Sequence, residues 1–182
     1  MSVIGQGRFV KPDIVVSHFH LREGDRVADF GAGAGYFARA LSRIVGRDGR
    51  VYACEIQRGL VDKLGSLKRE EKLSNLEPLR CDLEISDGVK LPDGTLDAGI
   101  LVNTLFQIEQ KEVALREISR ILRPGGKLFV IDWSESFGGM GPQEKDVLTK
   151  EDAVALCTEI GFELEREFDA GEHHYGCAFR RV

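Results

Sequence analysis

Residues 27–36 read VADFGAGAGY, and this stretch decides the fold of the chain. An apolar run of the kind that forms a buried β-strand ends there in three glycines, Gly31, Gly33 and Gly35, and a segment with helical spacing follows at once. Glycines at such a junction let the chain turn tightly and let a ligand approach the backbone, where a Cβ atom would intrude. The stretch therefore predicts the nucleotide-binding turn of a Rossmann-like domain.

The spacing of the glycines indicates which nucleotide is bound. The NAD fingerprint G-x-G-x-x-G is not met, because Tyr36 takes the place of its third glycine. The compact G-x-G-x-G form is the one found in S-adenosylmethionine enzymes. Asp29 would repel a pyrophosphate, but it suits a ligand that carries an ammonium and a sulfonium group. We therefore predict S-adenosylmethionine as the ligand, with an NAD-dependent oxidoreductase as the alternative that Tyr36 opposes.

Strands and helices alternate along the chain from this turn onwards. Alternation of this kind implies a parallel sheet with helices on both faces. The last two strands are joined by residues 169–174, a loop short enough for a hairpin, so the sheet should finish with an antiparallel edge strand. Strands are predicted at 26–30, 50–55, 76–80, 98–103, 127–133, 162–168 and 175–180, and helices at 36–45, 110–122 and 150–160, the second ended by the RPGG at 123–126.

Polar side chains follow several of these strands, at the edge of the sheet where ligands bind. Glu55 ends the second strand, 20 residues after Gly35, and can accept hydrogen bonds from both ribose hydroxyls; the alternative is a surface carboxylate. Asp82 can meet the adenine amino group while Leu83 packs on the ring, or it caps its own loop. Asn103 either contacts the ligand or caps the residues from Leu105 onwards.

Composition and charge limit the class of protein. A net charge of −5 opposes a dedicated nucleic-acid binder, and no apolar run reaches the roughly 18 residues that span a bilayer. The first eleven residues lack the apolar core of a secretory signal. The four cysteines form no CxxC pair, so we expect reduced thiols, a cytoplasmic protein and no metal site. One domain over residues 1–182 is predicted, with an N-terminal helical segment at 1–24 and a Rossmann-like core at 25–182.

Five stretches together carry a resemblance to a known family. They are VADFGAGAGYF at 27–37, GRVYACEI at 49–56, LDAGILVN at 96–103, LRPGGKL at 122–128 and the GF at 161–162. With them the chain resembles class I S-adenosylmethionine-dependent methyltransferases of the ubiquinone/menaquinone-biosynthesis branch, from about Pro12 to its end. The IDWS at 131–134, with MGP at 140–142, is similar to a subgroup of small members.

The resemblance implies a fold and a cofactor site. The fold is a doubly wound α/β sheet of seven strands in the order 3-2-1-4-5-7-6, with strand 7 antiparallel and helices on both faces. An N-terminal helix that includes Arg8, Phe9 and Pro12 should lie over the site. The residues implied in cofactor binding are Asp29, Gly31, Ala32, Gly33 and Gly35 around the methionine part, Glu55 and Ile56 at the ribose and adenine, and Asp82 and Leu83 at the adenine edge, to which our own analysis adds Asn103.

The methyl acceptor leaves a weaker signal. Methyl transfer needs chiefly the positioning of two reactants, and a general base helps only when the acceptor carries a proton of high pKa. Relatives often carry a histidine and then an acid after the fourth strand, where this chain has Phe106 and Gln107. The segments 132–147 and 169–174 should also reach the acceptor. Asp132, Glu135, His173 and His174 are candidates for substrate contact or for a base, since a neutral imidazole suits that role near physiological pH. Phe106, Trp133 and Phe137 are further candidate contacts. Paired histidines in a loop can instead be merely solvated, and aromatic residues can belong to the core.

The sequence thus predicts a methyltransferase that converts S-adenosylmethionine to S-adenosylhomocysteine on a small-molecule acceptor, with no catalytic residue assigned. Two alternatives remain: an RNA or protein methyltransferase of the same fold, and a cofactor-binding protein with weak or lost catalysis. Arsenite methyltransferases of related fold bind arsenic through several cysteines. Here Cys54 lies in a strand and Cys157 in a helix, which opposes their convergence on one ion.

Overall fold

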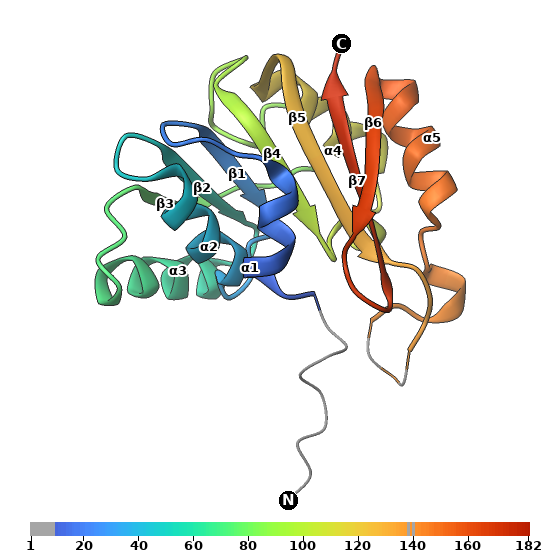
Figure 1. Cartoon of the computed structure of the whole chain (residues 1–182), viewed down its shortest axis with the longest axis horizontal. Coiled ribbons are helices and arrows are strands. Elements are labelled where there is room, and N and C mark those ends of the chain that lie inside the picture. Colours follow the sequence, from blue (N-terminus) through green and yellow to red (C-terminus); the bar gives the residue numbers. More distant parts are fainter. Residues whose placement is uncertain (1–9, 138, 140) are drawn as a thin grey trace, which may run out of the picture.

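The computed structural model describes residues 10–137, 139 and 141–182. Seven strands form one sheet in the order β3-β2-β1-β4-β5-β7-β6. Strand β7 runs antiparallel to both of its neighbours, and the other pairings are parallel, as predicted (Figure 1). The strands are β1 (Arg26–Phe30), β2 (Arg50–Glu55), β3 (Leu76–Arg80), β4 (Leu96–Val102), β5 (Leu122–Trp133), β6 (Phe162–Asp169) and β7 (His174–Arg181).

Helices cover both faces of this sheet. On one face the apolar core includes residues of α1, η1, α2 and α3, and on the other face it includes residues of α4 and α5 (Figure 1). Pro12, which was expected in the N-terminal helix, opens α1, while Arg8 and Phe9 lie outside the described residues. The helices are α1 (Pro12–Val15), η1 (Val16–Phe19), α2 (Tyr36–Val45), α3 (Arg58–Glu70), η2 (Leu105–Gln107), α4 (Lys111–Ile121), η3 (Glu144–Asp146) and α5 (Lys150–Ile160).

The structure differs from the predicted elements in three places. Helix α3 was not predicted; charged and polar residues make up most of its thirteen residues, and only Leu64 is fully buried. Strand β5 begins five residues early, since Leu122 already pairs with Leu96 although the proline and glycines after it end α4 as expected. Strand β4 covers 96–102 rather than 98–103, which leaves Asn103 just beyond the strand with a φ of 52°.

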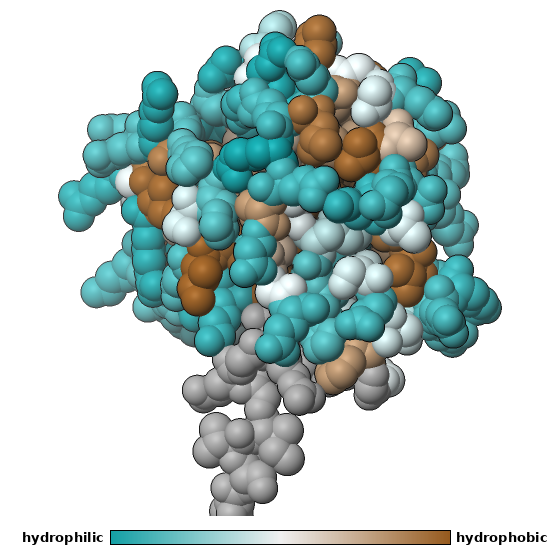
Figure 2. Space-filling view, turned by 45° about the vertical axis from the view of Figure 1, so that its right-hand side comes forward, coloured by the Kyte–Doolittle hydropathy of each residue, from teal (hydrophilic) through white to brown (hydrophobic). Residues whose placement is uncertain are grey.

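The helices in the described part of the chain are short, and the longest of them, α3, has thirteen residues. No helix among these residues combines the length and the apolar character that a membrane span requires. On the face that Figure 2 shows, hydrophilic residues dominate and the apolar ones are scattered between them.

The connection from β3 to β4 contains no helix, and two side chains of α4 hold it in place. The carboxylate of Glu117 accepts hydrogen bonds from the backbone N–H groups of Asp87 and Val89 at 3.2 and 2.9 Å. Arg120 pairs with Glu117 at 2.8 Å and donates to the carbonyl oxygens of Val89 and Leu91. Backbone groups that a helix would have satisfied internally are therefore satisfied by a buried ion pair.

Replacing Glu117 by alanine is expected to lower the free energy of unfolding by about 2 kcal/mol, because it leaves two backbone donors without an acceptor. It also removes the most buried of the three carboxylates that pair with Arg120, while Asp87 and Asp93 remain. Burial raises the pKa of Glu117, but the hydrogen bonds from Arg120 and the loop outweigh it and lower the pKa overall. The stabilisation is therefore present above the pKa of the unfolded chain and is lost as pH falls through the lower folded pKa. Urea unfolding followed by circular dichroism measures this, with Arg116→Ala on the exposed side of α4 as control. A loss below about 1 kcal/mol would contradict the assigned role.

Candidate functional site

Three glycines form the turn between β1 and α2, and each is required for a different reason. All three have positive φ angles, 79° at Gly31, 53° at Gly33 and 84° at Gly35. A Cβ at Gly31 would lie 2.6 Å from the hydroxyl of Thr104, and one at Gly35 would lie 2.6 Å from a methyl of Leu67. At Gly33 the space is open, with the nearest atom 4.0 Å away. Two glycines thus allow close packing, and the third leaves room for a ligand.

Two cavities adjoin at this turn, on the carboxyl edge of the parallel strands. The His174 cavity, of about 440 Å³, is lined by Asp29, Tyr36, Phe37 and His174 among others. The Glu55 cavity, of about 390 Å³, is lined by Glu55, Ile56, Asp82 and Leu83 among others. The cavities have four lining residues in common: Gly31, Gly33, Val102 and Asn103. Of the ten residues predicted to hold the cofactor, nine line one or both cavities, and only Gly35 does not.

Asp29 lies against the His174 cavity with 2% of its surface exposed. Its Oδ2 atom is buried and has no hydrogen-bond partner within the described part of the protein. Burial raises the pKa of this carboxyl to about 7; a backbone hydrogen bond from Ala38 opposes the shift and the charge of Glu55 adds to it. An unpartnered buried carboxylate oxygen requires a donor, and a ligand ammonium in the cavity would supply one.

Glu55 is 7% exposed and connects the glycine turn to the end of β2. Its carboxylate accepts hydrogen bonds from the backbone N–H groups of Gly33, Ile56 and Gln57, at 3.1, 2.9 and 3.1 Å. The alternative of a surface carboxylate is therefore wrong. An ionised carboxylate offers about four acceptor positions, so these bonds leave room for a ligand hydroxyl.

For Asn103 and Asp82 the sequence left two roles open, contact with the ligand or capping of the local backbone, and the structure answers differently for each. The Oδ1 atom of Asn103 is buried without a partner among residues that the structure describes, and η2 has no side-chain cap, so the capping alternative is wrong. Asp82 accepts a hydrogen bond from the N–H of Glu84 at 2.9 Å and caps its loop, while it also lines the Glu55 cavity. Its two predicted roles are compatible.

The two histidines of the hairpin are not solvated loop residues. His174 is 8% exposed, and its ring centroid lies 4.3 Å from that of Trp133. His173 places Nδ1 2.7 Å from a carboxylate oxygen of Glu135, and its ring stacks on Phe137 at 3.8 Å. Only His174 of these five residues lines the cavity at the glycine turn.

Asp132 corrects the expected set of substrate contacts. The residue is fully buried, and its carboxylate accepts hydrogen bonds from the N–H groups of Phe106 and Trp133, both at 3.0 Å. Burial raises the pKa of Asp132 to about 6, against the effect of these backbone donors. Asp132 therefore fixes η2 beside β5, and neither Asp132, Phe106 nor Trp133 lines either cavity. Trp133 belongs to the core, as its alternative reading held.

Sequence reasoning missed one contact at this site. Cys54 and Cys81, which are far apart in the chain, lie side by side at the ends of β2 and β3 and line the Glu55 cavity. The neighbouring thiol of Cys81 and, after it, burial raise the pKa of Cys54. All four cysteines are free thiols, and no cluster of three or more metal-binding side chains occurs among the described residues. The parallel pairing of β2 with β3 was the available signal.

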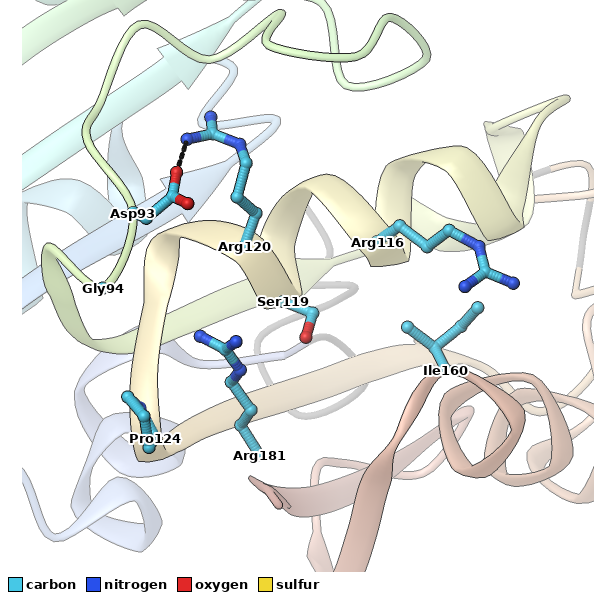
Figure 3. Close-up of a pocket in the computed structure, with 8 residues that line it drawn as sticks. All are labelled: Asp93, Gly94, Arg116, Ser119, Arg120, Pro124, Ile160 and Arg181. Carbon is cyan, nitrogen blue, oxygen red and sulfur yellow. Dashed lines mark hydrogen bonds and ion pairs between the residues drawn. The ribbon is translucent and has the colours of Figure 1, made fainter.

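A larger cavity, of about 590 Å³, lies between α4, α5 and the end of β7. Figure 3 shows Arg120 turned toward Asp93, and Arg181 donates a hydrogen bond to the carbonyl oxygen of Leu122. None of the predicted site residues lines this cavity. It lies at the amino ends of the parallel strands, away from the edge where ligands of such folds bind.

Comparison with known proteins agrees with this geometry. The family described as methyltransferase domain matches residues 28–130. The ubiquinone/menaquinone biosynthesis C-methyltransferase UbiE of Chromobacterium violaceum is 31% identical over 133 residues, which cover 70% of this chain and 53% of that protein. The UbiE of Teredinibacter turnerae is 32% identical over 117 residues, covering 63% and 45%. The chain thus spans about half the length of these curated relatives.

A solved structure resembles this chain over nearly its full length. A SAM dependent methyltransferase from Aquifex aeolicus superposes with a TM-score of 0.88 and is 28% identical. The superposition covers 96% of this chain and 91% of that one.

Proposed function

Because the chain belongs to the methyltransferase domain family, whose cofactor is S-adenosylmethionine, we propose that it transfers a methyl group from this cofactor to a small-molecule acceptor. The observation that carries the proposal is the pair of adjoining cavities with their unpartnered oxygens. Asp29 Oδ2 and Asn103 Oδ1 are both buried and both lack a donor in the described residues. Such groups in a native fold call for a ligand that donates to them.

The residues of the two cavities would bind different parts of the cofactor. Asp29, Gly31, Ala32, Gly33 and Asn103 would hold the methionine part, and Gly35 supports the turn from behind. Glu55 would bind the ribose, with Ile56, Asp82 and Leu83 around the adenine. When bound, the cofactor supplies a methyl group on a positively charged sulfur. The protein's own contribution is to orient the two reactants and to exclude water from them.

The acceptor would occupy the remainder of the His174 cavity, whose volume suits a small molecule. Its walls include the apolar side chains of Val10, Pro12, Phe37 and Val102. The UbiE relatives are named for ubiquinone and menaquinone biosynthesis, which favours an apolar ring compound as the acceptor. The net charge of −5 opposes RNA, the second acceptor class of this fold.

Calorimetry with S-adenosylhomocysteine tests the proposed cofactor. One molecule is expected to bind per chain, and the melting temperature should rise with ligand concentration. NADH serves as the negative control: it is expected neither to bind nor to raise the melting temperature. The proposal fails if millimolar S-adenosylhomocysteine neither binds nor raises the melting temperature, whatever the acceptor is.

Glu55 provides a test of the ribose assignment. Glu55→Gln is expected to weaken S-adenosylhomocysteine binding roughly 10- to 100-fold, because hydrogen bonds from ligand hydroxyls to a charged group are lost. Adenosine should bind the wild type more tightly than 2′-deoxyadenosine, and the variant should lose that preference. Titration of both nucleosides against both proteins measures the coupling. If the variant kept the full preference, Glu55 would hold only the glycine turn. Glu77→Gln, on β3 and half-exposed, is the control.

A further inference from the structure

Two cysteines that the proposed function does not use lie together in the wall of the Glu55 cavity. Cys54 is in β2, Cys81 directly follows β3, and both residues line the cavity. Both are free thiols. Cys54 has no exposed surface, whereas Cys81 is 7% exposed. A small reagent that enters the cavity therefore reaches Cys81 directly, with Cys54 buried beside it.

The pairing of β2 with β3 brings the two thiols to the same face of the sheet. Cys54 pairs with Leu79 in the parallel register. Cys81 lies two residues beyond Leu79, and side chains two residues apart in extended backbone point to the same side. Both cysteines belong to one cluster of the core. The thiol of Cys81 is also the largest cause that raises the pKa of Cys54, ahead of burial.

The backbone holds the two cysteines with different firmness. Cys54 lies between β1 and β3, and its carbonyl oxygen accepts hydrogen bonds from the N–H groups of Gly31 and Ala32 at 2.9 and 3.0 Å. Cys81 lies past the end of an edge strand, where its N–H donates to the carbonyl oxygen of Glu55 at 3.1 Å. Cys81 is therefore the residue that moves when the two sulfur atoms are brought together.

Movement of Cys81 changes the cavity, because the wall proposed for adenine begins at the next residue. Asp82 and Leu83 follow Cys81 directly, and both line the Glu55 cavity. A disulfide requires a close and specific approach of the two backbones. The two cysteines are offset by two residues in the register of the strands, so the bond forms only if Cys81 shifts toward β2. Asp82 and Leu83 shift with it.

We propose that Cys54 and Cys81 form an oxidisable thiol pair, which a peroxide converts to a disulfide that lowers the affinity of this site for S-adenosylmethionine. The effect on the cofactor rests on the proposed function, whereas the formation of the disulfide does not. Reduction of the disulfide by an external thiol restores the open cavity.

The oxidation takes two steps and consumes one peroxide for each disulfide. The Cys81 thiolate attacks one peroxide oxygen, the O–O bond breaks, and its electron pair leaves on the other oxygen, which takes up a proton. The sulfur of Cys81 is then a sulfenic acid. The Cys54 sulfur attacks it, the S–O bond breaks, and the departing hydroxide takes the Cys54 proton to form water. The two sulfur atoms together lose two electrons, which the peroxide gains.

The other two cysteines provide a comparison within the same chain. Cys157 is in α5 and Cys177 is in β7, and both are fully buried. Neither lines the Glu55 cavity or the His174 cavity. Burial is the largest cause that raises the pKa of Cys157 to about 12 and that of Cys177 to about 11. We expect these two thiols to stay reduced while Cys54 and Cys81 are oxidised.

Peptide mapping of the wild-type protein tests the disulfide without any ligand. After treatment with hydrogen peroxide, a digest under non-reducing conditions should contain the Cys54 and Cys81 peptides joined, about 2 Da lighter than their sum. Dithiothreitol should separate them. In Cys54→Ala, dimedone should trap the sulfenic acid on Cys81. A sulfinic acid on Cys81 without a joined peptide, or a joined pair that carries Cys157 and Cys177 instead, would overturn the proposal.

Calorimetry with S-adenosylhomocysteine measures the consequence for the cofactor. The oxidised wild type should bind at least about 10-fold more weakly than the reduced protein, and dithiothreitol should restore the affinity. Peroxide should not change the affinity of Cys54→Ala or Cys81→Ala, each compared with its own untreated sample. Cys157→Ala is the control and should respond to peroxide as the wild type does. A disulfide that forms without any loss of affinity would contradict the proposed effect.

These outcomes are distinct from failure of the proposed function. Cofactor binding by the reduced protein with no Cys54–Cys81 disulfide after peroxide would overturn the thiol pair and keep the cofactor assignment. If the reduced wild type bound no S-adenosylhomocysteine, the proposed function and the effect on affinity would both be wrong. Peptide mapping would still decide whether the two thiols are oxidised to a disulfide.

Discussion

Asp29→Asn is expected to weaken S-adenosylhomocysteine binding roughly 100-fold at pH 8. The carboxylate has one oxygen without a donor beside the cavity, and a ligand ammonium would complete it. The amide of asparagine has the same size but no charge. If it turned its NH2 group toward the ligand, it would also repel the ammonium. Isothermal titration of the two proteins measures the difference, with Asp62→Asn on the exposed side of α3 as control.

The same replacement is expected to stabilise the ligand-free protein. The pKa of Asp29 is about 7 in the folded chain, against 3.8 for an unperturbed aspartate. Between these two pH values the folded state holds a proton that the unfolded state has lost, so stability falls as pH rises through this window. Above about pH 7 the folded chain bears the whole cost of a buried charge. Asp29→Asn should therefore raise the melting temperature at pH 8 and change it little at pH 4, with a gain on the order of 2 kcal/mol.

A loss of stability at pH 8 would contradict this account of Asp29, and so would unchanged affinity for S-adenosylhomocysteine. In the wild type, affinity should increase as pH rises through about 7, because the ammonium group of the ligand binds the ionised form of the Asp29 carboxylate. The variant should lack that dependence.

The second large effect is expected from Gly33→Ala, which should reduce S-adenosylhomocysteine binding roughly 30-fold or more while leaving the fold intact. A Cβ at Gly33 projects into open space between the two cavities, so it meets the ligand and not the protein. The φ of 53° costs an alanine about 1 kcal/mol. Stability should fall by about that amount and no more.

Gly35→Ala is the matched comparison at the same turn. A Cβ there would lie 2.6 and 2.8 Å from methyl groups of Leu67 and Leu64, and φ is 84°. We expect a loss of about 2–3 kcal/mol in stability, because the core side of the turn is overpacked. Gly59→Ala, with no atom within 4 Å of the new methyl, should be neutral or slightly stabilising. If Gly33→Ala bound S-adenosylhomocysteine as tightly as the wild type, the ligand would not occupy the space beside Gly33.

Much of the site could be predicted from the sequence, because the turn is encoded locally. The glycines need positive φ angles and close approach, and these requirements restrict residue type at each position. Residues near the ends of parallel strands, such as Glu55 and Asn103, then converge by topology alone. The strand order β3-β2-β1-β4-β5-β7-β6 was implied by the family resemblance, and the terminal hairpin followed from the residues themselves.

The acceptor side could not be predicted in the same detail. Asp132 and His174 lie close together across the β5–β7 pair. The carboxylate of Asp132 is nevertheless enclosed beside η2, while His174 lines a cavity. That difference depends on which face of the sheet each side chain takes, and a shift of one residue in the hairpin would turn His174 to the other face. Contact between Cys54 and Cys81 likewise depends on strand pairing and not on chain spacing. Helix α3 was not predicted, because charged and polar residues make up most of it and only Leu64 is fully buried.

The connection without a helix between β3 and β4 has a consequence for binding. Asp82 and Leu83, at its start, line the cavity proposed for adenine, and α4 holds the rest of it through Glu117 and through a bond from the N–H of Gln110 to Glu84 at 2.7 Å. A wall that ordered only around its ligand would lose conformational entropy at the moment of binding. Here that entropy is lost when the chain folds, so a helix that lines neither cavity contributes to the affinity for the nucleotide.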